Sequence, residues 1–424
     1  MQKISAVSSS PWLRSLFFFG SLLVSHGVYA TEPITTQPHG IGLAQLIAQS
    51  IQNHPSVAAA HAQLGAARAD VDAARAQYYP TPTVQVLQDQ GQSSTVLALQ
   101  QPLWAGGRID AGLDAAQSRA NAAQVSITGA HYTLALRVTA AWTAWIQARD
   151  RAEVLDKGIA LFNVYAASVG RRIAGGASGQ VDRALVNARV AQTQGDLDAA
   201  RSAQRNALAR LAQLTGAPLR PQDLAAAVAA DSDDTAVASL DALISQSVMQ
   251  SAALKRQEAD IQTAQYDINQ RRAALWPTLN LRVQHQRNDT SGLNTSDNRL
   301  MLVLDYTPGA GMSAGANIDA AQARLLALRD NLDATRRDLT ETITADFEEH
   351  HSSSERARSM QRTISSNAEV LASYDRLFVA GRQSWLDVMN AARELIQAQT
   401  TLVDVAAQRT AARARLRLHM GEMR

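Results

Sequence analysis

Strict alternation of apolar and polar residues in a first arm, followed by a polar turn and an apolar return arm, predicts a β-hairpin within residues 278–307. Residues 279–286 read L-N-L-R-V-Q-H-Q, and residues 300–306 read L-M-L-V-L-D-Y. A period of two is typical of strands with one apolar and one polar face. The polar residues 287–298 between them are expected to form the turn. Because a lone hairpin is not stable in water, we expect it to pair with further strands.

The chain contains two copies of one module. The pattern of residues 43–51 returns at residues 240–248, an offset of 240 − 43 = 197 positions. Further along, Gly176 returns as Gly381, an offset of 381 − 176 = 205. A repeat of long period indicates a duplicated structural unit.

Both copies are expected to contain the same elements in the same order, namely a helix, a β-hairpin, a long helix and a return helix. In the first copy, residues 31–216, these elements are predicted at 42–78, 83–101, 108–173 and 180–214. In the second copy, residues 239–424, they are predicted at 239–275, 278–307, 312–379 and 384–419. The unrepeated residues 217–238 contain two prolines and an acidic run and are predicted to be a surface connector.

The fold class follows from the long helices and the hairpins together. Leucines at steps of three and four, such as Leu325, Leu328 and Leu332, indicate coiled-coil packing. A helix as long as the one predicted at 108–173 would extend about 100 Å. Four strands per chain cannot close into a barrel, and open strand edges cannot face lipid. Three copies would supply twelve strands. We therefore predict a mainly α fold that combines long helical hairpins with a trimeric membrane β-barrel.

Residues 1–30 have the pattern of a cleavable secretory signal. Lys3 and Arg14 precede an apolar run at 16–24, and small residues follow at positions 28–30. An uncleaved membrane anchor is the alternative, but the run is shorter than the roughly 20 residues that a spanning helix needs. We expect the mature chain to be exported.

Charge and cysteine content exclude several classes of function. The chain has 40 basic and 38 acidic residues, so it lacks the basic excess of a nucleic-acid-binding protein. It has no cysteine, which excludes disulfides, thiolate metal sites and a lipidated N-terminal cysteine.

Three motifs carry a resemblance to a known family. They are Q-P-L-W-A-G-G-R at 101–108, Y-T-P-G-A-G at 306–311 and A-G-R-Q-S-W-L-D-V-M-N-A at 380–391. In this order, and with the duplication, the chain resembles the TolC-like outer-membrane factor family. The first two motifs resemble the strand-to-helix corner of that family, and the third resembles its periplasmic helix tip. The corner residues are Pro102, Gly106, Gly107, Pro308, Gly309 and Gly311.

The resemblance implies a homotrimer with a twelve-stranded barrel in outer-membrane lipid and an α-helical tunnel through the periplasm. It also implies a periplasmic adaptor and an inner-membrane transporter as partners, and an equatorial position for the connector 217–238. The expected adaptor contacts at the two tips are Gly176, Ala177, Ser178, Gly381, Arg382, Gln383 and Ser384. The alternative for the glycines is that they only permit the turn.

The resemblance further places Asp387 at a ring of acids that closes the tunnel mouth. The second acid of that ring is Asn390 here, which reduces the expected charge, and Asp182 occupies the equivalent position in the first copy. Carboxylates gathered at a narrow opening would attract cations and repel one another. The alternative is local, because Ser384 and Asp387 have the spacing of a helix-capping box. Both roles can hold together.

No residue pattern indicates catalysis. Residues 348–351 (E-E-H-H) are neighbours on a predicted helix and do not share a face, so we expect no metal site there. No nucleophile–base pair and no phosphate-binding loop is found in the sequence. We expect no enzyme activity and no cofactor.

The predicted function is therefore that of a passive outer-membrane export conduit. The tip motif looks most like the branch that serves type I secretion of large adhesins, which implies an inner-membrane ABC exporter. The alternative is a drug or small-molecule efflux duct with a proton-driven pump. A soluble periplasmic coiled-coil scaffold is the alternative from another class, against which the two-faced hairpins argue.

Overall fold

The computed structural model describes residues 41–89, 92–228, 239–290, 293–307 and 309–422. The expected signal at residues 1–30 lies outside these residues, as does Pro308 of the second corner. The architecture is mainly helical, and the element order of the first copy recurs in the second. Among the described residues, no helix has a stretch long and apolar enough to cross a membrane.

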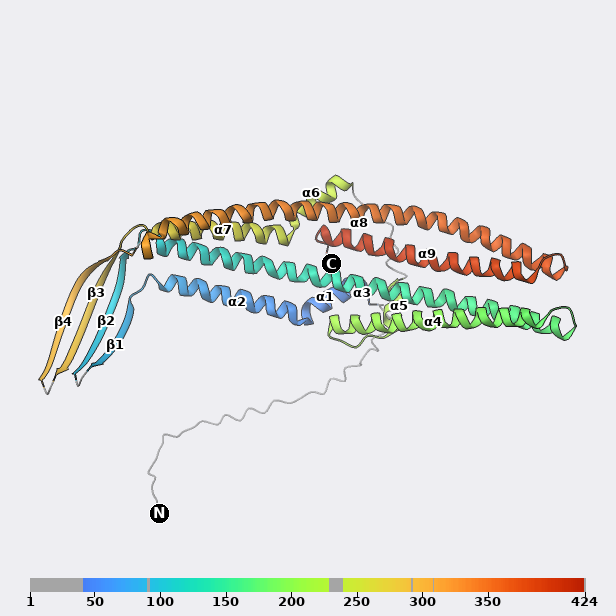
Figure 1. Ribbon diagram of the computed structural model, residues 1–424, viewed down its shortest axis with the longest axis horizontal. Helices are drawn as coiled ribbons and strands as arrows, with labels where there is room; N and C mark the ends of the chain where they lie inside the picture. Colours follow the sequence, from blue (N-terminus) through green and yellow to red (C-terminus); the bar gives the residue numbers. More distant parts are fainter. Residues whose placement is uncertain (1–40, 90–91, 229–238, 291–292, 308, 423–424) are drawn as a thin grey trace, which may run out of the picture. The chain divides into compact units, whose positions relative to one another are not determined.

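Four strands form one antiparallel sheet in the order β1-β2-β3-β4 (Figure 1). The strands are β1 (Thr81–Asp89), β2 (Gln92–Trp104), β3 (Thr278–Thr290) and β4 (Leu293–Asp305). The hairpins of the two copies therefore pair with each other along β2 and β3, where Leu99 lies opposite Val283. The partner that each hairpin needs is supplied first by the other copy.

The strands extend well beyond their predicted ends. Residues 287–298 were expected to be a turn, but β3 continues to Thr290 and β4 begins at Leu293. Arg287 pairs with Ser296 along this extension. Polar side chains do not interrupt a ladder made by backbone groups, and they are common where both faces of a sheet meet water. The expected twelve-residue turn was therefore wrong.

The first helix of each copy is broken, which is a second departure from the prediction. The helix expected at 42–78 is α1 (Leu43–Asn53) and α2 (Pro55–Ala76), and that expected at 239–275 is α6 (Leu240–Gln250) and α7 (Ala252–Ala273). His54 is extended (φ −78°, ψ 130°) because a residue before proline avoids the helical region. At the equivalent position, the Ser251 hydroxyl accepts a hydrogen bond from the Leu254 N–H at 3.3 Å and begins α7.

Two helical hairpins make up the rest of the fold. They are α3 (Arg108–Ala174) with α4 (Gln180–Thr215), and α8 (Ala314–Val379) with α9 (Trp385–His419). The short α5 (Pro221–Val228) lies in the expected connector, whose residues 229–238 are outside the described part of the chain. A 3₁₀ turn, η1 (Ala310–Met312), precedes α8, which begins two residues later than predicted because Gly311 and Met312 have positive φ (61° and 58°).

Helices of the two copies pack along one another. In the chain's contacts, α3 is flanked by α2 and α4 on one side and by α7 and α9 on the other, and α8 packs against α7 and α9 (Figure 1). The approach of α3 to α9 is close at Gly158, where an added Cβ would lie 2.9 Å from Cδ1 of Ile396. Small residues at such crossings let the helix axes approach.

The two largest apolar clusters of the described residues lie along α3. One lies midway along α3, where Trp142 and Trp145 pack with leucines of α1, α4 and α5. The other lies toward the far end of α3, where Phe162 packs with Trp385 and Met389 of α9. The second cluster joins the two helical hairpins just behind their turns.

Candidate functional site

Both helical hairpins turn through the same backbone geometry. In the first, Gly176 has φ +71°, its N–H donates to the Ile173 carbonyl at 3.0 Å, and the Ala177 N–H donates to the Arg172 carbonyl at 2.8 Å. In the second, Gly381 has φ +74° and the same pair of bonds is formed, at 3.0 and 2.8 Å. This is the helix-ending turn that glycine favours. The turn alone explains both glycines.

The remaining tip residues are presented to solvent around these turns. Ala177, Arg382 and Ser384 are exposed, whereas Ser178 and Gln383 are partly buried. The Arg382 side chain forms no ion pair within the described residues. Their role as adaptor contacts stays a prediction.

Asp387 closes the first turn of α9. Its N–H donates to Oγ of Ser384 at 3.2 Å. Its carboxylate accepts hydrogen bonds from the Ser384 hydroxyl at 2.6 Å and from Nε2 of Gln383 at 2.7 Å. In the first hairpin, the carboxylate of Asp182 accepts from the Gly179 N–H at 3.3 Å. Each acid therefore has the local capping role, while a role for either acid or for Asn390 in a gate stays a prediction.

Aromatic side chains tie the two hairpins together behind the tips. Tyr165 of α3 donates from its hydroxyl to the carboxylate of Asp375 of α8, at 2.9 and 3.0 Å to the two oxygens. Its ring meets that of Trp385 edge to face, with centroids 5.5 Å apart. Trp385 also contacts Phe378 at 5.2 Å, and the Arg172 guanidinium lies 4.3 Å from the Phe378 ring.

The contact between Tyr165 and Asp375 shifts the pKa of the phenol. Burial and the hydrogen bond to Asp375 both raise the pKa of Tyr165, so the phenol stays protonated and keeps donating. Sequence reasoning missed the contact, although the concentration of aromatic residues close to both tips was a usable signal. The contact adds a phenol–carboxylate bond and an aromatic cluster to the apolar packing that joins the two hairpins behind their tips.

One residue of the predicted strand-to-helix corners lies in a strand instead. Pro102 lies inside β2, at an irregularity of the ladder opposite Asn280, and does not lie in the corner. The corner itself contains Gly106 (φ +60°) and Gly107 (φ +82°), and a Cβ on Gly106 would lie 2.9 Å from Cβ of Trp276. In the second corner, Gly309 and Gly311 also have positive φ (87° and 61°).

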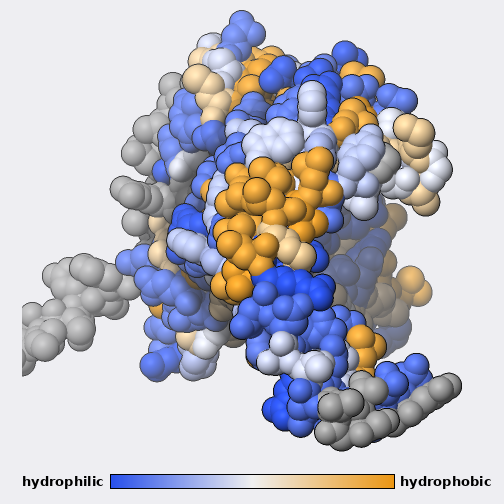
Figure 2. Space-filling view, turned by 90° about the vertical axis from the view of Figure 1, so that its left-hand side faces the viewer, coloured by the Kyte–Doolittle hydropathy of each residue, from blue (hydrophilic) through white to orange (hydrophobic). Residues whose placement is uncertain are grey.

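The two faces of the sheet have opposite chemistry. Val84, Leu300, Leu302 and other apolar side chains on one face are exposed, with 70%, 71% and 67% of their surface accessible. Figure 2 looks from the strand side and shows a hydrophobic patch bordered by hydrophilic residues. The other face has polar pairs, such as Arg282 with Gln100 at 2.8 Å.

Aromatic side chains gather where the sheet meets the helices. Tyr79, Trp104, Trp276 and Tyr306 are all exposed, and the rings of Trp104 and Trp276 meet edge to face at 6.4 Å. Aromatic belts of this kind occupy the interface between lipid and water in membrane proteins. The apolar face of the sheet is therefore bordered by aromatic residues of the kind found at a membrane surface.

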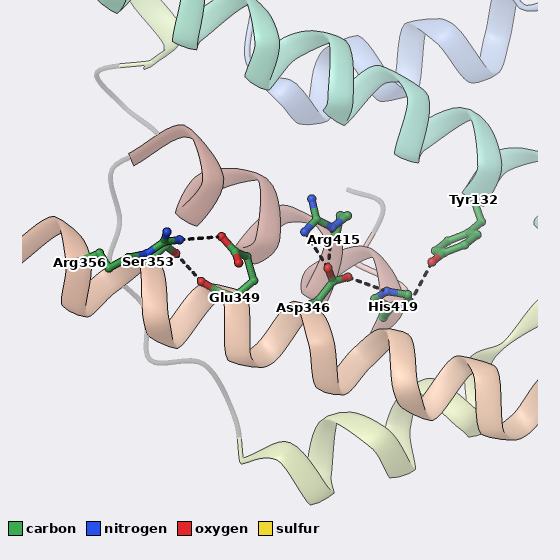
Figure 3. A network of polar contacts seen from close by, with 7 residues as sticks. All are labelled: Tyr132, Asp346, Glu349, Ser353, Arg356, Arg415 and His419. Carbon is green, nitrogen blue, oxygen red and sulfur yellow. Dashed lines mark hydrogen bonds and ion pairs between the residues drawn. The ribbon is translucent and has the colours of Figure 1, made fainter. Parts of the chain in front are cut away.

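A buried polar network lies where α3, α8 and α9 meet (Figure 3). Asp346 of α8, 7% exposed, accepts from Nε of Arg415 at 2.7 Å and bonds to Nε2 of His419 at 3.2 Å. His419 bonds in turn to the Tyr132 hydroxyl at 2.9 Å. Burial alone would raise the pKa of Asp346, but the hydrogen bonds from His419 and Arg415 outweigh it and lower the pKa.

The acidic and histidine-containing stretch at 348–351 lies on α8. Within the described residues, no three His, Asp or Glu side chains are grouped closely enough to hold an ion. Glu349 instead pairs with Arg356 at 3.1 Å (Figure 3).

Comparison with known proteins identifies the class of the fold. The model of the family described as outer membrane efflux protein matches residues 46–217 and 243–422. No curated protein sequence matches the chain. Among solved structures, CusC is similar with a TM-score of 0.77 and 18% identity over 90% of this chain and 93% of that one.

Two further solved structures show the same fold. The outer membrane protein VceC of Vibrio cholerae has a TM-score of 0.73 and 16% identity, over 89% of this chain and 96% of that one. The CmeC outer membrane channel of Campylobacter jejuni has a TM-score of 0.72 and 14% identity, over 89% of this chain and 85% of that one.

Proposed function

The chain belongs to the outer membrane efflux protein family, and from this membership we propose that it is a passive export conduit through the outer membrane. The observation that carries the proposal is the four-stranded sheet, which is apolar and exposed on one face and polar on the other. Such a sheet needs lipid on one side and water on the other. No chemistry of its own is required of the chain.

We propose that three copies close the barrel. In the described chain, β1 and β4 each pair along one edge only. An unpaired edge cannot face the hydrocarbon of a bilayer, because its backbone N–H and C=O groups would lack partners. Pairing β4 of one copy with β1 of the next joins twelve strands without a free edge. The polar face, with Arg282, Gln100 and Asn280, then lines the lumen.

Tryptophan quenching by brominated lipids tests this placement. Trp104, at the end of β2, and Trp276, just before β3, are exposed, whereas Trp142, Trp145 and Trp385 are buried among helices. In proteoliposomes, lipids brominated near the headgroup should quench more strongly than lipids brominated near the chain ends. A variant with both exposed tryptophans changed to Phe should lose this quenching. Quenching that is absent in the parent protein would refute the lipid-facing assignment.

At the other end of the helices, we propose that the two tips meet a periplasmic adaptor and form the gate. The exposed residues around Gly176 and Gly381 offer a contact surface that includes Arg382, which forms no ion pair among the described residues. Asp387 and Asp182 lie in the first turn of the return helices. The family resemblance supports these roles. Energy for transport then comes from the inner-membrane partner.

Within this role, we propose type I protein secretion with an ABC exporter, supported by the resemblance of the tip motif at 380–391 to the adhesin-export branch. A small-molecule efflux duct with a proton-driven pump is the second candidate, and the description of the matching family as efflux proteins favours it. Crosslinking the tagged protein in intact envelopes and identifying the inner-membrane transporter that co-purifies separates the two. An ABC exporter supports the first, and a proton-driven pump overturns it.

A further inference from the structure

A pocket of about 350 Å³ lies where α1, α3, α8 and α9 meet. Apolar side chains form part of its lining, with Leu43 from α1, Trp142 and Ile146 from α3, and Val403 from α9. Three arginines of α9 also line it, namely Arg409, Arg413 and Arg417. Its size falls in the range of small-molecule sites, which combine an apolar lining with a few charged groups.

The three arginines share one face of α9. They are four residues apart, and like charges at this spacing repel one another and weaken a helix. Arg417 has a partner in Glu422 at 3.0 Å. Arg409 is exposed and has no ion pair in the part of the chain that the structure describes. Asp150, the acid in the lining, already pairs with Arg149 at 2.6 Å.

The internal repeat shows that helix packing does not require these charges. At the offset of 205, the positions of the three arginines correspond to Gln204, Leu208 and Ala212 of α4. The return helix of the first copy is thus uncharged at all three positions. The three arginines that line the pocket are therefore found in the second copy and not in the first.

The lining of the pocket also includes a tryptophan and the first residue of a helix. Trp142 is 2% exposed, and its indole Nε1–H, buried in the lining, has no hydrogen-bond partner within the described residues. The N-terminal turn of α1, which contributes Leu43, begins after Gly42, which has no side chain to cap it, and carries no acidic residue. An uncapped helix N-terminus attracts negative charge. The helix N-terminus and the arginines both favour an anionic ligand.

We propose that this pocket binds a small organic anion. Its apolar or aromatic body packs against Leu43, Trp142 and Ile146, and its phosphate, sulfonate or carboxylate group is held by Arg409 and its neighbours on α9. The site is separate from the tips and from the sheet, and it does not depend on the cargo of the conduit.

Calorimetric titration of the full-length protein in neutral detergent tests the site. Three probes separate the contributions: phenyl phosphate has both parts, inorganic phosphate has only the charge, and benzyl alcohol has only the ring. Phenyl phosphate should bind most tightly. Because a charged hydrogen bond is lost, R409Q should weaken its binding by about tenfold or more. R329Q is the matched control, because Arg329 is exposed on α8 away from the pocket and its change alters the net charge equally.

Several results would overturn the proposal. Absence of phenyl phosphate binding to the parent protein is one, and equal binding by the R409Q and R329Q variants is another. If inorganic phosphate bound as tightly as phenyl phosphate, the apolar lining would contribute nothing to binding.

Discussion

Replacing Asp346 with Ala should destabilise the fold more than any exposed ion-pair substitution. The carboxylate is the only acid in the network of Figure 3 that contacts both Arg415 and His419, at 2.7 and 3.2 Å. Its side chain is 10% exposed, whereas that of Arg415 is 36% exposed. Removing one partner of a buried pair costs about 3–5 kcal/mol. Water can reach part of Arg415, so we expect the lower end, about 3 kcal/mol.

Differential scanning calorimetry of the purified variants measures this effect. With about 2.1 cal/mol/K of unfolding entropy per residue, a loss of about 3 kcal/mol lowers the melting temperature of a chain of this size by about 3–4 °C. Glu349→Ala is the matched control on the same helix, because its pair with Arg356 is exposed (39% and 49%). An exposed pair contributes about 0–1 kcal/mol, so the control should melt within about 1 °C of the parent.

The same pair of variants gives a pH test. The folded-state pKa of Asp346 is lowered, so its contribution to stability is present above the unfolded pKa of about 3.9 and is lost as the pH falls through the folded value. The stability gap between the parent and Asp346→Ala should therefore be full at pH 7 and should shrink in strong acid. Equal melting of Asp346→Ala and Glu349→Ala, or a gap that does not change in acid, would refute the assignment.

Three further predictions concern the tips and helices. Gly381→Ala places a side chain at φ +74° and should lower the stability of the fold by about 1 kcal/mol. Gly195→Ala, in the middle of a helix with open space around it, should raise the stability by up to about 1 kcal/mol. Calorimetry that shows the same sign for both variants would contradict the turn geometry. Tyr165→Phe removes the hydrogen bond to Asp375 and should lower the stability by about 1 kcal/mol. If this bond holds the tips closed, the variant should also show a higher conductance in planar bilayers. An unchanged conductance would limit the bond to a structural role. Asp387→Ala should reduce cation preference in the same assay, and unaltered selectivity would leave only the capping role.

Local features of this protein were predictable from the sequence. The duplication, the long helices and the glycine turns follow from periodicity and from the positive φ that glycine adopts without strain. The break at His54 was also readable, since Pro55 disfavours a helical conformation at the residue before it. The long polar turn of the second hairpin was wrong because polarity is a property of side chains, while a strand ladder is made by backbone groups.

Contacts between distant residues were decided only by the tertiary structure. Nothing in the spacing of the two hairpins shows that β2 pairs with β3. Likewise, Asp346 and His419 lie 73 positions apart, and Tyr132 lies 287 positions from His419. Their network and the arginine-lined pocket exist because α9 packs between α3 and α8. A sequence determines which face of a helix is apolar, but packing between helices decides which polar side chains that face brings together.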